Sequence, residues 1–498
     1  MNISIDLKPS REEFIKISGR FNVIPLSAEL GDDFISPIQL YSKLKDKSHS
    51  FLLESVEGEE KISRFSFVGF NPLYVFKSKA DSIEINDLTL GSRKHFKTSL
   101  DPLEELKKLM SRFKVFSSKD LRFPGGFVGY LGYDNIRFFE PVLNKNSRIK
   151  DAESIFVFCK YLCVFDHKEK NIRIISFVVL PEDINKNKLT SVYAAETEKL
   201  KKVIRSFYSH SRLVPIGLGR KTKLLRYKSN ISKKDFMAQV MRAKEYIKKG
   251  DIIQVVLSQR LEVNYSRDPF DIYRYLRILN PSAYMYYINF KDVKIIGASP
   301  EMLLRCENEV LITRPIAGTR PRNSNDQKDV LLEKDLLKDP KEKAEHIMLV
   351  DLGRNDLGRV SRKGKVSVPI FMKIERFSHV MHIVSEVRGF MDKKKDVFSA
   401  LRSCFPAGTV SGAPKIRAMQ IIDELEKTSR RIYAGCVGYF SFTGNLDTAI
   451  IIRTIVLRKK KAYVQAGAGI VLDSKPEKEY FETLNKAKAQ LLALQLAS

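Results

Sequence analysis

The chain has 498 residues, a formal net charge of +28 and no tryptophan. Its residues are 43% hydrophobic, 10% aromatic and 29% charged, which is typical of a globular protein and excludes a disordered chain, a collagen or a disulfide scaffold. A chain of this length buries well over half of its unfolded surface, so it needs no cross-links to fold.

The sequence lacks the marks of a membrane or secreted protein. Its longest uncharged stretch runs only from Ile432 to Leu446, short of the ~20 apolar residues that a membrane span needs. The N-terminal MNISIDLKPSREEF has no apolar core of the kind that signal peptides carry. The five cysteines are scattered and odd in number, which favours reduced thiols. We therefore expect a cytoplasmic protein.

The positive charge suggests nucleic acid as a partner, but the pattern of basic residues does not support it. Dense basic clusters occur only at residues 393–395 and 458–461, each between two apolar runs, as a loop would be. Zinc-finger spacing, an RNA-recognition aromatic motif and basic heptads are all missing. We expect no nucleic-acid partner, and the charge remains compatible with an anionic substrate.

The N-terminal part alternates short apolar runs with turn signals, such as Asn71-Pro72 and Pro124-Gly125-Gly126. Residues 182–235 are polar and lysine-rich, which predicts a connection between two parts of the chain. We accordingly divide the chain into an N-terminal lobe (1–200), a connecting segment (201–230) and a C-terminal domain (231–498).

The C-terminal part has clearer signals. Ser232 and Gly250 mark the two ends of a predicted helix, and residues 251–263 are β-rich. Strand pairs are expected around 291–292 and Asn308. Further helices are predicted from Pro340 to about Asp351 and from Pro476 to about Leu494. The hairpins favour an α+β fold, a two-lobed sandwich of largely antiparallel sheets with helices outside.

Two glutamate pairs stand at helical i,i+3 spacing, Glu342 with Glu345 and Glu479 with Glu482. This spacing puts each pair on one helix face. If the two pairs converge, they form an oxygen-rich site for a hard cation such as Mg²⁺. The alternative is that both pairs only solvate a helix surface.

Other residues suggest recognition of an anion. Glycine turns at 318–319, 408–409 and 467–469 let backbone N–H groups approach a carboxylate closely. Arg453 is predicted inside an apolar strand, where it needs a ligand or an ion-pair partner. His379 and His382 have the i,i+3 spacing of one helix face, but no third ligand for zinc is near.

Taken together, these segments resemble the chorismate-utilising enzymes, most closely the large subunit of anthranilate synthase. The resemblance covers nearly the whole chain and is dense from about 225 to 490. It rests on LLES, RFSFVGFNP, GGFVGYLGYD, GDIIQVVLSQR, GASPE, RPIAGTRPR, AEHIMLVDLGRNDLGRV, GTVSGAPK, GYF and QAGAGIVLDSKPEKEY, which occur in one order. It implies the chorismate-binding fold, with residues 1–200 as a tryptophan-binding regulatory lobe and 231–498 as the catalytic domain.

The resemblance also implies a metal site. Glu345 and Glu482 would hold Mg²⁺ against the ring carboxylate of chorismate. Glu342 and Glu479 would support the ion through water. The ion would neutralise charge and position the substrate.

For catalysis, the resemblance implies that Glu301 protonates the leaving C4 hydroxyl, which requires a raised pKa. His382 would assist proton abstraction and pyruvate elimination, or else only orient the leaving group. The polar groups of chorismate would be bound by Gly318, Thr319, Thr409, Tyr433, Arg453, Gly467, Ala468 and Gly469.

Two positions discriminate between members of the family. Relatives that add water to make isochorismate or salicylate look as if they use a lysine as the base at the position of Gln254. The neutral amide of Gln254 cannot deprotonate water, whereas ammonia needs no such base. Relatives that make aminodeoxychorismate typically carry lysine at Ala317. Both residues favour anthranilate. The alternatives are an aminodeoxychorismate synthase or, less favoured, an isochorismate or salicylate synthase. A different class of alternative is a basic binding protein that has kept this fold without turnover.

The resemblance further implies two partners. The chain has no cysteine elbow of a glutamine amidotransferase, so a separate subunit is expected to supply ammonia, which makes a hetero-oligomer. L-Tryptophan is expected to inhibit from a site that includes Ser55, Ala283, Tyr284 and Met285. Ala283 stands where proline is common, which removes a fixed φ angle from that site.

Overall fold

The computed structural model describes residues 5–56, 64–117, 121–143, 153–181, 184–208, 213–217, 225–377 and 380–498. The longer helices are α1 (Arg11–Ser18), α4 (Pro102–Ser111), α6 (Lys186–Phe207), α7 (Lys233–Lys248), α8 (Pro269–Leu279), α9 (Asp326–Lys338), α10 (Pro340–Gly358), α11 (Val397–Cys404), α13 (Lys415–Leu425) and α14 (Pro476–Leu496). Short helices are α2 (Pro37–Ser42), α5 (Ile136–Phe139) and α12 (Gly408–Ser411), with single 3₁₀ turns at Tyr133–Asn135 and Pro141–Leu143.

The strands of the N-terminal part are β1 (Val23–Gly31), β2 (Ser50–Glu54), β3 (Phe65–Lys79), β4 (Ser82–Asp87), β5 (Ser92–Lys97), β6 (Gly126–Leu131), β7 (Ser154–Asp166) and β8 (Asn171–Val179). Those that follow are β9 (Lys228–Ser229), β10 (Gln254–Asn264), β11 (Tyr284–Asn289), β12 (Val293–Ser299), β13 (Met302–Glu307), β14 (Val310–Thr313), β15 (Ile316–Pro321), β16 (Ser361–Arg376), β17 (Val380–Met391), β18 (Gly412–Ala413), β19 (Cys436–Ser441), β20 (Leu446–Ile450), β21 (Thr454–Arg458) and β22 (Lys461–Ile470).

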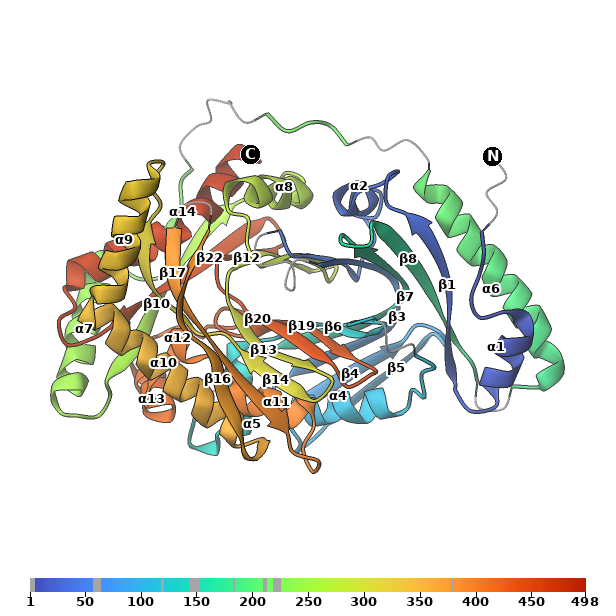
Figure 1. Ribbon diagram of the computed structural model, residues 1–498, viewed down its shortest axis with the longest axis horizontal. Helices are drawn as coiled ribbons and strands as arrows, with labels where there is room; N and C mark the ends of the chain where they lie inside the picture. The colour runs from blue at the N-terminus through green and yellow to red at the C-terminus, as the bar shows by residue number, and fades with distance from the viewer. Residues whose placement is uncertain are drawn as a thin grey trace.

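Antiparallel pairing links the described strands into one strongly curved sheet, as in β10 with β22 and β3 with β7. Helices cover its outer faces, with α7, α10, α13 and α14 at one end and α1 and α6 at the other (Figure 1). Two large hydrophobic cores fill the inside of the molecule. The predicted α+β fold with antiparallel sheets and outer helices is confirmed.

Strands from the two parts of the chain pair with each other. β2 pairs with β11 through Leu53 and Tyr286, and β6 pairs with β19 through Gly129 and Gly438. The N-terminal and C-terminal parts are therefore interlocked within the sheet. The functional division into a regulatory lobe and a catalytic domain stays a prediction.

Part of the predicted connection is a helix. α6 runs through the proposed boundary at residue 200 and ends at Phe207. Although lysine-rich, this segment buries Leu189, Leu200 and Ile204 along one side. Such a narrow stripe at helical spacing is enough to dock a helix, but it is easily missed among so many polar residues.

Most predicted elements of the C-terminal part are confirmed. Ser232 caps α7 by accepting a hydrogen bond from the Asp235 backbone N–H, and Gly250 follows the helix with φ of +78°. The strand pairs β11–β12 and β13–β14 are antiparallel hairpins. The basic clusters at 393–395 and 458–461 lie at turns between elements.

Two elements differ from the predictions. α10 continues to Gly358, seven residues beyond the predicted end, because Gly353 lets it lie against the sheet: a Cβ there would stand 3.2 Å from Thr313 Cγ2. His382 belongs to strand β17 and not to a helix, since its segment completes the sheet between β15 and β16. His379 lies outside the described residues.

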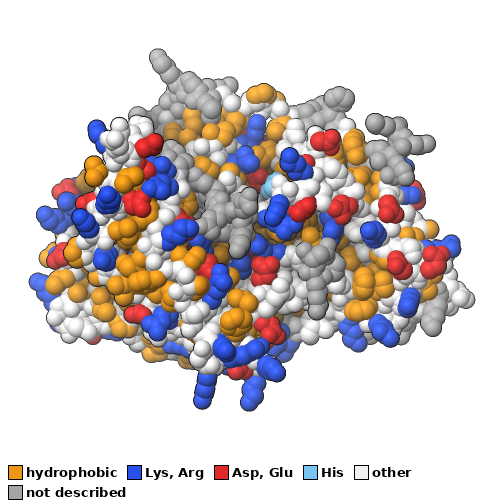
Figure 2. All heavy atoms as spheres, viewed as in Figure 1, with side chains coloured by type: hydrophobic (Ala, Val, Ile, Leu, Met, Phe, Trp, Pro, Cys, Tyr) orange, Lys and Arg blue, Asp and Glu red, His pale blue; other side chains and the backbone are white. Residues whose placement is uncertain are grey.

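The surface and the cysteines agree with the composition. On the face shown in Figure 2, lysine and arginine side chains are scattered among acidic ones and form no continuous patch. All five cysteines are buried free thiols. No helix among the described segments combines the length and apolar character needed to cross a membrane.

A buried ion pair joins several segments beneath the sheet. Arg430 and Glu426 lie 2.7 Å apart with side chains that are 1% and 7% exposed. Arg430 also donates to the carbonyls of Val256 and Val410, each at 2.6 Å. Glu426 accepts from the backbone N–H and the hydroxyl of Ser258. One ion pair thus fixes β10 and helix α12, which stands where the sequence predicts a turn at 408–409.

We predict that Arg430→Met lowers the free energy of unfolding by about 3–5 kcal/mol, because it leaves the carboxylate of Glu426 buried without an opposite charge. Urea unfolding would measure the loss. Arg242→Met, which breaks an exposed pair with Glu245, is the matched control and should cost less than about 1 kcal/mol. Equal effects of the two substitutions would contradict the prediction.

Candidate active site

Helices α10 and α14 carry the two glutamate pairs. Glu342 lies 3.4 Å from Arg320, and Glu482 forms an ion pair with Lys486 at 2.7 Å. Glu345 accepts a hydrogen bond of 3.5 Å from the amide of Gln254. The first pair thus contacts Gln254, a residue of the predicted site, and both pairs contact basic side chains.

Within each pair, negative charges stand side by side in a partly dry environment. Burial raises the pKa of Glu342, and the charge of Glu345 raises it further. Burial likewise raises the pKa of Glu479, with Glu482 adding to the effect and Ser474 opposing it. Carboxylates arranged in this way are stabilised by a bound cation.

The four glutamates do not converge into one tight cluster. Among the described residues, no three His, Cys, Asp or Glu side chains are grouped closely enough to hold a metal ion by themselves. The donor set still fits Mg²⁺, which takes only one or two protein carboxylates and completes its shell with water and substrate oxygens.

The predicted glycine turn at 318–319 is instead an irregularity within strand β15, and it lies against the histidine. Gly318 has φ of +74°, and a Cβ there would stand 3.1 Å from the Glu342 carboxylate. His382 Nδ1 lies 3.0 Å from the Gly318 carbonyl and 3.0 Å from the Thr319 hydroxyl. Because a carbonyl only accepts, Nδ1 carries the proton, and Nε2 keeps a free lone pair.

The environment of His382 favours the neutral ring. Burial lowers its pKa, the Gly318 carbonyl opposes this, and the positive charge of Arg453 lowers it again. A neutral imidazole with a bare Nε2 is able to accept a proton.

Arg453 is not inside a strand, as the sequence predicts, but at the break between β20 and β21 with φ of +51°. The apolar run is interrupted there, and the guanidinium turns towards α14, where it donates to the Lys486 carbonyl at 2.8 Å. No carboxylate of the described residues forms an ion pair with it. Burial lowers its pKa. A buried, unpaired arginine is suited to an anionic ligand.

Residues 467–469 are not a turn, as the sequence predicts, but part of strand β22, where they pair with β10. They form a floor without side chains. A Cβ at Gly467 would stand 2.8 Å from the Tyr433 hydroxyl, and one at Gly469 would stand 2.4 Å from the Gln254 amide nitrogen. The Ala468 side chain points the other way, into a hydrophobic cluster. Only the backbone of Ala468 faces the predicted substrate position.

Glu301 is a buried acid at the start of β13, 8% exposed. Burial raises its pKa to about 7, an effect that Thr409 and Lys486 partly offset. Thr409 lies close to Glu301, but its hydroxyl makes no full hydrogen bond to a described residue. Both residues line one cavity of about 430 Å³. A carboxyl with this pKa is half protonated near neutral pH and can act as a general acid.

Lys486 is the residue that sequence reasoning missed. Besides its ion pair with Glu482, its ammonium group donates to the Gly467 carbonyl at 3.1 Å. It therefore connects α14 to the glycine floor. Its position one helical turn after Glu482 is the signal that could have revealed it, because i,i+4 residues share a helix face.

The four residues predicted to bind tryptophan come together in the structure. Ser55, Ala283, Tyr284 and Met285 line one cavity with an empty volume of about 540 Å³. The Ser55 hydroxyl is buried and has no hydrogen-bond partner among the described residues. This cavity is separate from the glutamate pairs and holds an unsatisfied polar group.

Comparisons with known proteins identify the family. A family model described as chorismate binding enzyme matches residues 48–492. Anthranilate synthase component 1 of Acetivibrio thermocellus is 47% identical, covering 98% of this chain and 99% of that protein. The corresponding protein of Aquifex aeolicus is 45% identical, covering 100% of this chain and 99% of the relative.

A solved structure is also similar. Anthranilate synthase component I from Streptococcus pneumoniae superimposes with a TM-score of 0.75 and 38% identity, covering 93% of this chain and 99% of that one. The resemblance inferred from the motifs is confirmed over nearly the full length. This chain belongs to the chorismate binding enzyme family.

Proposed function

We propose that the chain is the synthase subunit of an anthranilate synthase, which converts chorismate and ammonia to anthranilate, pyruvate and water. The observation that carries this proposal is the arrangement of an unpaired Arg453, a glycine floor and two carboxylate pairs around one position. Chorismate carries two carboxylates, so it needs a cationic and a metal-assisted contact. The five buried free thiols favour a cytoplasmic setting.

In binding, the Arg453 guanidinium would take one carboxylate of chorismate, since its planar fork donates two hydrogen bonds. Glu345 and Glu482 would hold Mg²⁺, with Glu342 and Glu479 supporting it through water. Mg²⁺, when bound, supplies positive charge that orients the ring carboxylate. The bare backbone of Gly467 and Gly469 lets the ring approach closely.

In the amination step, ammonia adds at ring C2 and the C4 hydroxyl leaves as water while the ring double bonds shift. Glu301 would give its proton to that hydroxyl. The Gln254 side-chain oxygen is buried and has no partner among the described residues, while its amide group is held by Glu345. It would therefore accept an N–H of the incoming ammonia and orient the nucleophile.

In the elimination step, the C2 proton is removed and the ring C–O bond breaks, so that pyruvate leaves and the ring becomes aromatic. We propose His382 as the group that assists here, because its Nε2 carries a free lone pair. Ala317 and Gln254 favour anthranilate over aminodeoxychorismate and isochorismate. A separate glutamine amidotransferase would supply the ammonia, as the component name of the relatives suggests.

We also propose that tryptophan binds in the cavity around Ser55 and Met285 and inhibits the enzyme. The cavity has the size of a small-molecule site and an unsatisfied hydroxyl. Tyr284 of β11, which lines the cavity, pairs with Ser299 of β12, and Glu301 follows Ser299 by two residues. A ligand that moves β11 would therefore reach the general acid.

The isolated chain should form fluorescent anthranilate from chorismate, ammonia and Mg²⁺. Glutamine should replace ammonia only when the amidotransferase is added. EDTA should abolish the activity, because the glutamate pairs need a cation, and Mg²⁺ should restore it. Formation of 4-amino-4-deoxychorismate as the main product would contradict the assignment.

The pH profile should report Glu301. With rates expressed per unprotonated ammonia, kcat/KM for chorismate should fall as pH rises through about 7, because the general acid loses its proton. Glu301→Gln should lower kcat by about 100-fold or more and abolish the fall of kcat/KM around pH 7. Glu307→Gln, on the same hairpin but paired with Arg122 at the surface, is the control. A flat profile for the native protein from about 6 to about 8 would rule out the role.

Ser55→Phe should weaken tryptophan binding by about tenfold or more, because the larger side chain fills the cavity, and should leave kcat unchanged. Since the chain has no tryptophan, the fluorescence of the ligand reports binding directly. Ser42→Phe, at the end of α2 and outside this cavity, is the control. Unchanged binding in Ser55→Phe would place the inhibitor elsewhere.

A further inference from the structure

Arg260 lies on the same sheet face as the candidate active site. It belongs to β10, where it follows Gln254 by six residues, and it pairs with Gln465 of β22. Because alternate residues of a strand share a face, Arg260 and Gln254 point to the same side. On β22 the residues Gln465, Gly467 and Gly469 follow the same rule. The sheet therefore continues from the glycine floor directly to Arg260.

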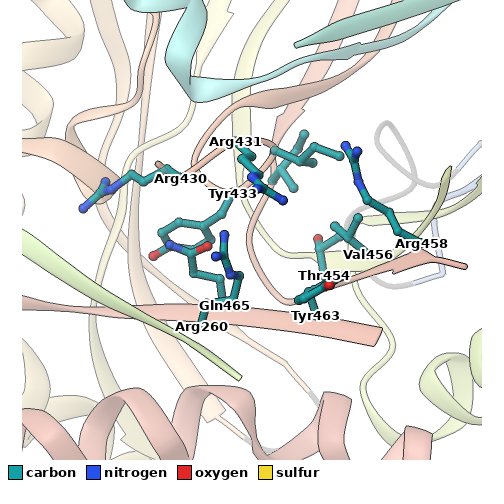
Figure 3. Close-up of a pocket in the computed structure, with 11 residues that line it drawn as sticks. Arg260, Arg430, Arg431, Tyr433, Thr454, Val456, Arg458, Tyr463 and Gln465 are labelled. Atoms are coloured by element: carbon teal, nitrogen blue, oxygen red, sulfur yellow. The ribbon is translucent and has the colours of Figure 1, made fainter. Parts of the chain in front are cut away.

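At this position the sheet is hollowed into a pocket with an empty volume of about 440 Å³. Its walls include the rings of Tyr433 and Tyr463 and the aliphatic side chains of Ile451 and Val456 (Figure 3). Tyr433 is shared by the two sites, since its hydroxyl lies against Gly467 and its side chain lines the pocket.

Within the described residues, Arg260 makes its direct contacts with neutral groups. It donates to the Ser429 carbonyl at 3.4 Å, and its guanidinium lies 5.8 Å from the centre of the Tyr463 ring. No carboxylate of the described residues forms an ion pair with it. Burial lowers its pKa, and the positive charge of the neighbouring Arg431 lowers it further.

The nearest acidic groups are engaged elsewhere. Glu262 forms an ion pair with Lys461 at 2.6 Å. Asp134 accepts a hydrogen bond of 2.9 Å from the Arg431 backbone N–H, and burial raises its pKa to about 7, so it is only partly ionised at neutral pH. Both carboxylates attract Arg260 from a distance, but neither forms an ion pair with it.

Two other arginines can be compared with Arg260 by whether a carboxylate pairs with them. Arg430 also borders the pocket, but Glu426 neutralises it, so it is structural. Arg453, in the candidate active site, is unpaired like Arg260. The feature that marks the chorismate position therefore occurs a second time, on the other side of Tyr433.

We propose that this pocket is a second binding site, for a planar aromatic monocarboxylate. Arg260 would hold the carboxylate, and Tyr433 and Tyr463 would enclose the ring. Aromatic walls select a ring over a small aliphatic acid. The ligand's identity rests on the proposed function, whose product anthranilate is such a compound. Because Tyr433 is shared, product in this pocket would inhibit in a way that chorismate does not overcome.

Equilibrium dialysis with radiolabelled benzoate tests the pocket without turnover. The native chain should bind two benzoates, and Arg260→Gln and Arg453→Gln should each bind one, because losing a charge-assisted contact weakens binding by about tenfold or more. Val456→Phe should also bind one, since it fills the pocket while keeping Arg260. Arg417→Gln, which breaks an unrelated pair with Asp251, is the control and should bind two.

Kinetics give a second readout. Anthranilate should inhibit the native enzyme with a mixed pattern against chorismate and the Arg260→Gln variant with a competitive one, at unchanged kcat. The proposal is wrong if Arg260→Gln and Val456→Phe both keep two benzoates. The assignment of the ligand as an aromatic acid is wrong if pyruvate displaces the Arg260-dependent benzoate as well as unlabelled benzoate does. If the Arg260-dependent benzoate binds but no anthranilate is formed from chorismate, the proposed function is contradicted, while the second binding site is supported.

Discussion

The buried pair of Arg430 and Glu426 is the interaction on which the rest of the site depends. It joins β10 at Val256 and Ser258 to helix α12 at Val410, so that Gln254 and Thr409 stand on supports that cannot move independently. It also lies beside the segment that carries Tyr433. A buried ion pair with all its hydrogen bonds made is costly to break, and it gives these segments one arrangement.

Around this support, the binding sites are distinguished by charges left incomplete. Arginines elsewhere in the fold, such as Arg305 with Asp447, are paired with carboxylates. Among the described residues, Arg453 and Arg260 donate hydrogen bonds to backbone carbonyls and form no ion pair, and the glutamates within each pair on α10 and α14 stand beside each other. Such groups cost folding free energy unless a ligand completes them. The proposed chorismate position and the proposed second pocket share this property, with Tyr433 between them.

The sequence predicted the helices and hairpins whose ends carry local signals. Ser232 and Gly250 bounded α7 because capping is a short-range interaction. Prediction from the sequence was less successful where packing decides the structure. α10 passes through Gly353 because a neighbouring strand needs the space, and His382 became part of a strand because β15 and β16 flank it. The buried stripe of α6 was too narrow to separate from its polar surroundings.

For function, the ordered motifs by themselves determined the family, since residue identity at many fixed positions is a property of the chain. They also supplied Glu301, Arg453 and the glutamate pairs as candidates. Only the tertiary structure decided which charges are left unpaired, because pairing depends on partners far away in sequence. It separated Arg430 from Arg260, turned the Ala468 side chain into the core, and brought Lys486 to the glycine floor. Those distinctions are made by packing and burial, which no local pattern encodes.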